Sequence, residues 1–150
     1  MTMRALERLL AEQDCRNLVY RAAAHADQGE PSALAELFTD DAVLVRPGAQ
    51  PLTGRDAIRA AYAQRAAERI TRHLVAQTLI AFPAPDLAQG LSLVQLWIGS
   101  TAAPGPYGFC APVQRVGEIE DCFALTPLGW RIARREARFV LHDGAVASQG

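Results

Sequence analysis

Apolar residues recur at every third or fourth position over the first part of the chain, which predicts one long helix over residues 3–27. Gln28-Gly29 ends this helix, and Pro31 suits the first turn of a short second helix that runs to about Phe38. The apolar stripe of the long helix is carried by Cys15, Leu18, Val19, Ala22 and Ala26.

A third helix is predicted after a loop that contains prolines and a glycine. Its start, Thr53-Gly54-Arg55-Asp56, resembles a capping box with Asp in the place of the usual Glu. The side chains on its successive turns are then Ile58, Ala61, Tyr62 and Arg65.

Strand-like patterns fill the rest of the chain, beginning with a short strand over residues 42–46. Turns that contain proline or glycine separate four longer predicted strands, at about residues 72–82, 91–99, 113–125 and 129–141. Because helices come first and strands later, the predicted fold class is α+β, with helices on one face of an antiparallel sheet. No repeat or long linker divides the chain, so residues 1–150 are expected to form a single domain.

Two charged residues interrupt the apolar faces of neighbouring predicted strands. Asp121 lies on the face that carries Ile119 and Phe123. Arg135 lies on the apolar face of the next strand. An unpaired buried charge is very costly, so we expect Asp121 and Arg135 to form a structural ion pair.

Composition excludes several classes of protein. The 50% of apolar and 21% of charged residues are an ordinary globular balance. A net charge of −1, without a basic stripe that has interleaved aromatic residues, argues against nucleic-acid binding. No apolar run approaches the length of a membrane span, and the N-terminus has no apolar signal segment. Widely spaced Cys15, Cys110 and Cys122 fit reduced thiols in the cytoplasm, and Cys15 and Cys122 are expected to be small buried side chains.

The segment Thr71-Arg72-His73-Leu74-Val75 places an imidazole in an otherwise apolar strand. Asp27 lies at the end of the first helix, at the edge of the apolar stripe, so the two side chains could meet as an acid–base pair. An imidazole exchanges protons near neutral pH, which suits general acid–base catalysis. The alternatives are a core histidine that is satisfied by hydrogen bonds, and an Asp27 that faces solvent or binds loop amides.

Five short blocks follow one another across nearly the whole chain. They are Ala26-Asp27-Gln28-Gly29-Glu30, Leu37-Phe38-Thr39-Asp40-Asp41-Ala42, Gly54-Arg55-Asp56-Ala57-Ile58, Thr71-Arg72-His73, and Gly129-Trp130-Arg131-Ile132 with Arg135. Together they resemble SnoaL-like proteins of the nuclear-transport-factor-2-like superfamily. The resemblance implies a cystatin-like α+β barrel, in which a curved antiparallel sheet forms a cone around a pocket and three N-terminal helices close it.

The same resemblance implies a kinship with polyketide cyclases, scytalone dehydratase and ketosteroid isomerases. Asp27 matches the Asp that closes the first helix in the dehydratase-like members, and His73 matches their strand histidine. We therefore expect a cofactor-free lyase or isomerase that acts on a hydrophobic small molecule by dehydration, cyclisation or a double-bond shift. His73 would be the general base or acid, and Asp27 would orient it or transfer a second proton. Tyr20, two helical turns before Asp27, would donate a hydrogen bond to a substrate oxygen.

Two other functions stay open at this point. One is a non-catalytic module that binds a small molecule in the same cone, and the other is the small structural subunit of a ring-hydroxylating dioxygenase. The resemblance also implies a homodimer formed through the sheet. Its interface would include Glu118, Glu120, Arg134 and Arg138.

The predicted pocket walls are Tyr62, Gln95, Trp97 and Phe109. Trp97 and Gln95 alternate on one strand, so a large ring and a polar group share a face there. The alternative is that these aromatic rings belong to the core. The sequence has no glycine-rich phosphate loop, serine nucleophile elbow or zinc-binding HExxH motif, so we expect neither a cofactor nor a metal.

Overall fold

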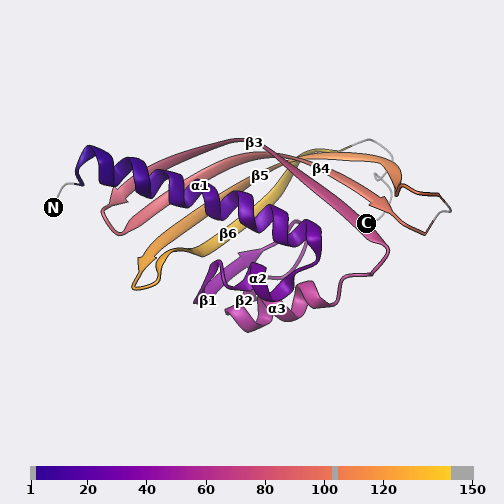
Figure 1. Cartoon of the computed structure of the whole chain (residues 1–150), viewed down its shortest axis with the longest axis horizontal. Helices are drawn as coiled ribbons and strands as arrows, with labels where there is room; N and C mark the ends of the chain where they lie inside the picture. The colour runs from indigo at the N-terminus through magenta and orange to yellow at the C-terminus, as the bar shows by residue number, and fades with distance from the viewer. Residues whose placement is uncertain (1–2, 103–104, 143–150) are drawn as a thin grey trace.

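Two helices, two short strands and a third helix come first in the chain, and the last four strands follow without a further helix (Figure 1). The computed structural model describes residues 3–102 and 105–142. In chain order the elements are α1 (Ala5–Gln28), α2 (Pro31–Ala35), β1 (Phe38–Val45), β2 (Leu52–Thr53), α3 (Arg55–Ala63), β3 (Arg69–Ala84), β4 (Leu87–Ser100), β5 (Phe109–Thr126) and β6 (Gly129–His142).

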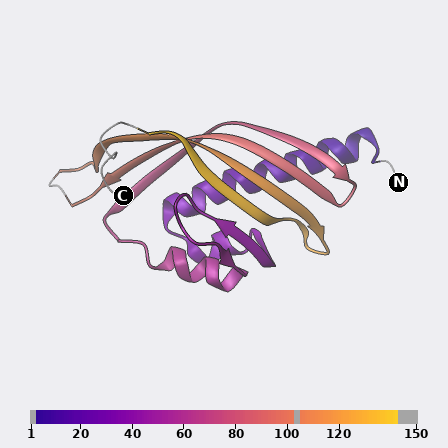
Figure 2. The same cartoon turned by 180° about the vertical axis from the view of Figure 1, so that it is seen from behind.

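The strands form one curved sheet in the order β2-β1-β6-β5-β4-β3. Figures 1 and 2 show that the long strands curve together and that the sheet stays open. The α+β prediction is confirmed, with one correction to the strand directions: β1 and β6 run parallel, whereas the other neighbours are antiparallel. β1 enters the sheet from the helices and pairs with the last strand of the chain, so no hairpin imposes an antiparallel direction on that pair.

The helix ends follow local backbone chemistry. Gly29 ends α1 in the left-handed conformation at φ 70°, and its N–H donates to the Ala26 carbonyl. The predicted capping box at Thr53 is wrong, because Gly54 is the N-cap of α3, the helix begins at Arg55, and no capping side chain donates or accepts a hydrogen bond there. Thr53 instead belongs to the two-residue strand β2, and the Gly54 N–H donates to the Ala42 carbonyl at 2.8 Å.

Single-residue bulges change which side chains of a strand face inward. In β6 the register shifts at Ala133, since Ile132 pairs with Phe123 and Arg134 pairs with Cys122. As a result Ile132 and Arg135 are both buried, although strict alternation puts them on opposite faces.

The register of β3 shifts in the same way at Ala76. Before that bulge, His73 and Val75 face inward and line a cavity. After it, Thr78 is buried and Ile80 packs against the core. Bulges also bend a strand, which contributes to the curvature of the sheet.

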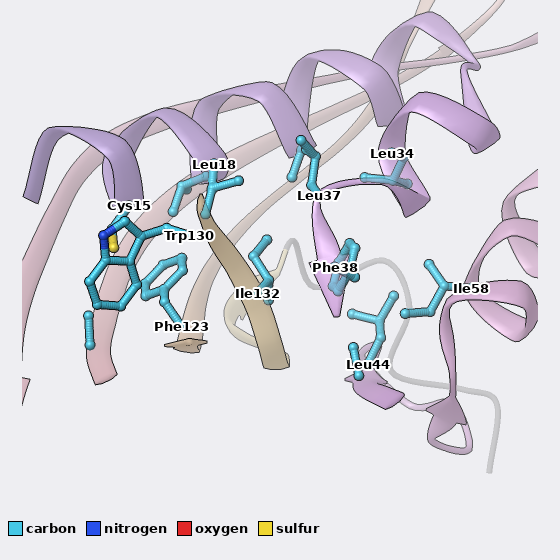
Figure 3. Close-up of a cluster of buried hydrophobic side chains, with 14 of the residues drawn as sticks. Cys15, Leu18, Leu34, Leu37, Phe38, Leu44, Ile58, Phe123, Trp130 and Ile132 are labelled. Carbon is cyan, nitrogen blue, oxygen red and sulfur yellow. The ribbon is translucent and has the colours of Figure 1, made fainter. Parts of the chain in front are cut away.

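The core lies between α1 and the sheet and continues toward α3 (Figure 3). Cys15 and Leu18 of α1 pack over Phe123, Trp130 and Ile132, and the cluster extends through Phe38 and Leu44 to Ile58. Burial raises the pKa of the Cys15 thiol to about 12, so this cysteine stays protonated, as expected for a small apolar side chain. Cys122 is exposed, because it lies on the outward face of β5, and the prediction that it is buried is wrong.

Helix α1 also lies along β3, which forms one edge of the sheet. Arg16 of α1 donates from Nε to the Thr78 carbonyl at 3.2 Å. Two helical elements, α2 and α3, pack against each other beside β1. No helix in residues 3–102 and 105–142 is long and apolar enough to cross a membrane.

Candidate active site

The last turn of α1 and the first half of β3 bring Asp27 and His73 together. The Nδ1 atom of His73 lies 2.6 Å from Oδ1 of Asp27. The backbone N–H of His73 donates to the other carboxylate oxygen, Oδ2, at 2.8 Å. One carboxylate thus holds both the main chain and the ring of the same histidine, which fixes the ring relative to the strand.

Further donors complete the surroundings of Asp27. Thr71 donates from Oγ1 to Oδ1 of Asp27 at 2.8 Å, and Arg65 donates in turn to Thr71 Oγ1 at 3.0 Å. Arg65 also donates to the Ala26 carbonyl in the last turn of α1. These bonds tie the end of α1 to β3 and to the segment after α3.

Asp27 is held in its ionised form. Only 10% of its side chain is exposed, and this burial by itself raises the pKa. The side-chain and backbone hydrogen bonds from His73, the charge of its ring and the bond from Thr71 outweigh burial, so the pKa of Asp27 is lowered. An ionised carboxylate beside Nδ1 accepts a hydrogen bond from Nδ1–H. In the neutral ring Nε2 then carries no proton and can accept one.

His73 lines a cavity of about 620 Å³ between α1 and the inner face of the sheet. That volume is in the range of small-molecule sites. Its wall is mainly apolar and includes Val19, Ala22, Leu34, Phe38, Leu44 and Val94. Polar and charged residues also line it, among them His73, Thr71, Tyr62, Arg46 and Arg135.

Tyr20 does not line this cavity. It lies with Asp27 and His73 at a second, more open depression of about 480 Å³, and its side chain is 44% exposed. The helical spacing correctly put Tyr20 and Asp27 on one face of α1, but a neighbouring face, with Val19 and Ala22, looks into the main cavity. Asp27 therefore supports His73 from behind the cavity wall.

Of the predicted pocket walls, Tyr62 lines the main cavity and the other three line neither hollow. Leu96 of β4 faces the cavity, so Gln95 and Trp97 point to the opposite face of the sheet. Phe109 is 65% exposed at the start of β5. The prediction that Gln95, Trp97 and Phe109 form the pocket is therefore wrong.

The sequence reasoning also missed a cavity residue, Arg46. It is the last residue of the predicted strand over residues 42–46 and directly follows β1 in the structure, but its charge gave no reason to place it inside. The available signal was the period of two along the predicted strand, which puts Arg46 on the same face as the apolar residues Ala42 and Leu44, and both of these are buried.

Asp121 and Arg135 form a bidentate ion pair between β5 and β6. Arg135 donates from Nε at 2.7 Å and from Nη2 at 2.8 Å to the two carboxylate oxygens. Burial by itself lowers the pKa of Arg135, but the charge and hydrogen bonds of Asp121 outweigh it and raise that pKa. The opposite charges of Asp121 and Arg135 compensate each other. Arg135 lines the cavity and Asp121 does not.

Comparison with known proteins identifies the family. The model of the SnoaL-like domain matches residues 7–136. The chain belongs to the SnoaL-like domain family. No curated protein matches this SnoaL-like domain.

Solved structures share the fold over most of its length. A protein from Novosphingobium aromaticivorans DSM 12444, provisionally assigned as a scytalone dehydratase, has 20% identity and a TM-score of 0.80, and the match covers 93% of this chain and 91% of that chain. A hexachlorocyclohexane dehydrochlorinase has 14% identity and a TM-score of 0.80 over 93% and 92% of the two chains. An NTF2-like protein with a cystatin-like fold, also from Novosphingobium aromaticivorans, has 25% identity and a TM-score of 0.74 over 95% and 88%.

Proposed function

We propose that this SnoaL-like domain is a lyase or isomerase that uses His73 as a general base on a hydrophobic small molecule. The observation that carries the proposal is the 2.6 Å contact between His73 and a largely buried Asp27, at the wall of an apolar cavity of about 620 Å³. A basic side chain held by a second group, beside a hollow of ligand size, is the arrangement that proton abstraction requires.

In this proposal Nε2 of His73 takes a proton from a carbon next to a carbonyl group. In an elimination the electron pair left behind forms a double bond and expels the β-hydroxyl group, which takes the proton back from the His73 imidazolium and leaves as water. In a double-bond shift the pair moves along the conjugated system and the imidazolium returns the proton to the γ-carbon. Asp27 keeps Nδ1–H in place and stabilises the imidazolium that forms. Because Asp27 has a lowered pKa and receives three hydrogen bonds, it orients His73 and is poorly suited to be the second acid.

Similar proteins support the reaction class. The names of two of them, a provisionally assigned scytalone dehydratase and a hexachlorocyclohexane dehydrochlorinase, both denote eliminations. The alternative of a binding module would be favoured by a His73 and an Asp27 beyond hydrogen-bond reach of each other, and they are within that reach.

A solvent-exchange assay tests the proposal and does not require that the natural substrate be identified first. A panel of cyclic β-hydroxy ketones and β,γ-unsaturated ketones would be incubated with the protein in D₂O. Deuterium uptake next to the carbonyl, followed by NMR, reports proton abstraction even where no product accumulates. We expect uptake that depends on His73.

The matched control is His25→Ala, because His25 also contacts a carboxylate but lies outside both hollows. The proposal fails if His73→Ala exchanges every compound as fast as the wild type. Binding of panel members in the cavity, without exchange or turnover, would favour the binding module instead.

We also propose that the domain forms a homodimer through the outer face of the sheet. Register partners Leu79 and Leu91 are exposed there, at the β3–β4 pair. Arg138 is paired with Glu118 and Glu120 within the same chain, so these charges need no partner subunit. Sedimentation velocity of the wild type and of Leu79→Lys tests this, and a wild-type monomer would contradict it.

A further inference from the structure

Arg46 presents a charge to the cavity that no carboxylate of the described residues neutralises. It directly follows β1 and lines the same cavity as His73. Its Nε atom is buried and has no hydrogen-bond partner within residues 3–102 and 105–142. No ion pair joins Arg46 to a carboxylate in that part of the chain. A buried donor without a partner is costly, so it points to a group that arrives from outside the chain.

The other cationic groups around the cavity are engaged elsewhere. Arg135 is neutralised by Asp121, and Arg138 donates to Glu118 and Glu120 on the strands beside it. Arg65 donates to Thr71 and to two main-chain carbonyls.

Two more arginines, Arg69 and Arg115, line the cavity as well. Arg69 is exposed, so water can hydrate its charge. Arg115 stacks on Phe139, with its guanidinium carbon 4.8 Å from the ring centroid. Arg46 is thus distinguished by the buried, unsatisfied Nε.

The neighbour of Arg46 makes its position well defined. The guanidinium carbon lies 5.7 Å from the centroid of the Tyr62 ring, at cation–π distance. The Tyr62 hydroxyl is a second hydrogen-bond donor that lines the same cavity. A planar guanidinium held on a ring, next to a phenol, matches the two oxygens of a carboxylate.

We propose that Arg46 and Tyr62 form a carboxylate-binding subsite, so that the ligand of the main cavity is a hydrophobic small molecule that carries a carboxylate. The apolar wall holds its hydrocarbon part. The only carboxylate among the described lining residues, Glu118, is already bonded to Arg138 and does not compete. This inference rests on the proposed function only in placing the ligand in the cavity that His73 lines.

Binding of 1-naphthoate and 1-naphthamide, measured by isothermal titration calorimetry, tests the subsite. The two probes share one ring system and differ in charge. We expect the wild type to bind naphthoate about tenfold or more tightly than naphthamide, since hydrogen bonds to charged groups discriminate by that order. Arg46→Gln should abolish the preference by weakening naphthoate alone.

The matched control is Arg115→Gln, which removes the same charge from the same cavity and also takes an arginine off an aromatic ring. It should keep the preference for naphthoate. Arg46→Lys keeps the charge without the planar fork and should retain part of the preference, which serves as a second variant if Arg46→Gln fails to fold. The subsite is refuted if the wild type does not prefer naphthoate, if naphthoate shows no saturable binding at millimolar concentration, or if Arg115→Gln loses as much preference as Arg46→Gln.

Failure of the subsite and failure of the proposed function give different results. Naphthoate has no proton on the carbon next to its carboxylate and no leaving group, so its binding does not depend on turnover. His73→Ala should retain the preference for naphthoate while it loses deuterium exchange. Exchange that depends on His73, together with no naphthoate preference, would overturn the subsite and leave the reaction class standing.

Discussion

Two histidine–carboxylate pairs lie at the end of α1, and they share the length of their contact but differ in the surroundings of the carboxylate. His73 and Asp27 meet at an Nδ1–O distance of 2.6 Å, and so do His25 and Glu30. The two imidazoles are equally exposed, at 28% and 27% of their side chains. The carboxylates are not, since Glu30 is 46% exposed and Asp27 is 10% exposed.

The difference lies in what surrounds each carboxylate. Asp27 also accepts hydrogen bonds from the His73 main chain and from Thr71, and its histidine lines the main cavity. The pair of His25 and Glu30 bridges the turn that ends α1, and neither residue lines the main cavity or the second depression. A short contact therefore does not by itself mark a catalytic pair. Burial of the carboxylate, its additional donors and access to a cavity are what set Asp27 and His73 apart.

The largest expected effect separates the two pairs by turnover. His73→Ala should lower kcat/KM by about a hundred- to ten-thousandfold, the usual contribution of a positioned general base. His25→Ala should stay within about twofold of wild type, because it lies outside the cavity. Steady-state kinetics on any compound that passes the exchange assay checks this. Equal losses in both variants would show that the two pairs are equivalent.

The second-largest effect should be a difference in stability between variants of the two carboxylates, Asp27 and Glu30. Asp27→Asn removes a buried acceptor of charged hydrogen bonds and should lower the free energy of unfolding by about 2 kcal/mol. Glu30→Gln removes an exposed partner and should cost at most about 0.5 kcal/mol. Urea denaturation followed by circular dichroism measures both. A cost for Asp27→Asn no greater than that for Glu30→Gln would mean that the additional donors contribute nothing.

Acid should destabilise the protein through Asp27. The pKa of Asp27 is lowered in the folded state, so its contribution is fully present above the unfolded value of about 3.9 and is lost as the pH falls through the lower folded value. Asp27→Asn should therefore flatten the acid side of the stability curve, whereas Glu30→Gln should keep its wild-type shape. Urea midpoints measured from pH 6 downward to about pH 2 test this. An unchanged acid limb in Asp27→Asn would assign the loss to other groups.

The smallest effect should come from the hydroxyl that supports the buried pair. Thr71→Val keeps the shape of the side chain but removes the donor to Asp27, and should cost about 1 kcal/mol of stability. Thr71→Ser restores the hydroxyl and should recover most of this loss. If Thr71→Val is as stable as the wild type and Thr71→Ser is destabilised, the methyl group of Thr71 matters and its hydrogen bond does not.

Much of the architecture could be predicted because it depends on local patterns. The stripe of α1, its end at Gly29 and the four long strands need only side-chain periodicity and turn residues. The sequence also led to the contact of His73 with Asp27, because an unusual polar residue in an apolar strand needs a partner. The parallel pairing of β1 with β6 could not be predicted in this way, since it joins distant parts of the chain.

The errors in the predicted pocket have one physical origin. The residues of a pocket wall depend on which positions of each strand point inward and on which face of a helix lies toward the cavity. Side-chain periodicity alone does not determine either of these. Gln95 and Trp97 lie on the face of β4 that points away from the main cavity. Tyr20 lies on the face of α1 next to the one that lines the cavity. The bulge at Ala133 had the same effect on β6, where it buries Ile132 together with Arg135. A bulge of this kind leaves no clear trace in the local sequence.

The position of Asp27 has a consequence for the integrity of the sheet. β3 is an edge strand, and an edge strand offers unpaired main-chain groups on which another chain can add a strand. The Asp27 carboxylate occupies the His73 N–H at that edge, and the Arg16 guanidinium occupies the Thr78 carbonyl. Loss of Asp27 would thus free a main-chain donor at the sheet edge, so we expect Asp27→Asn to favour aggregation by strand addition, apart from any effect on activity.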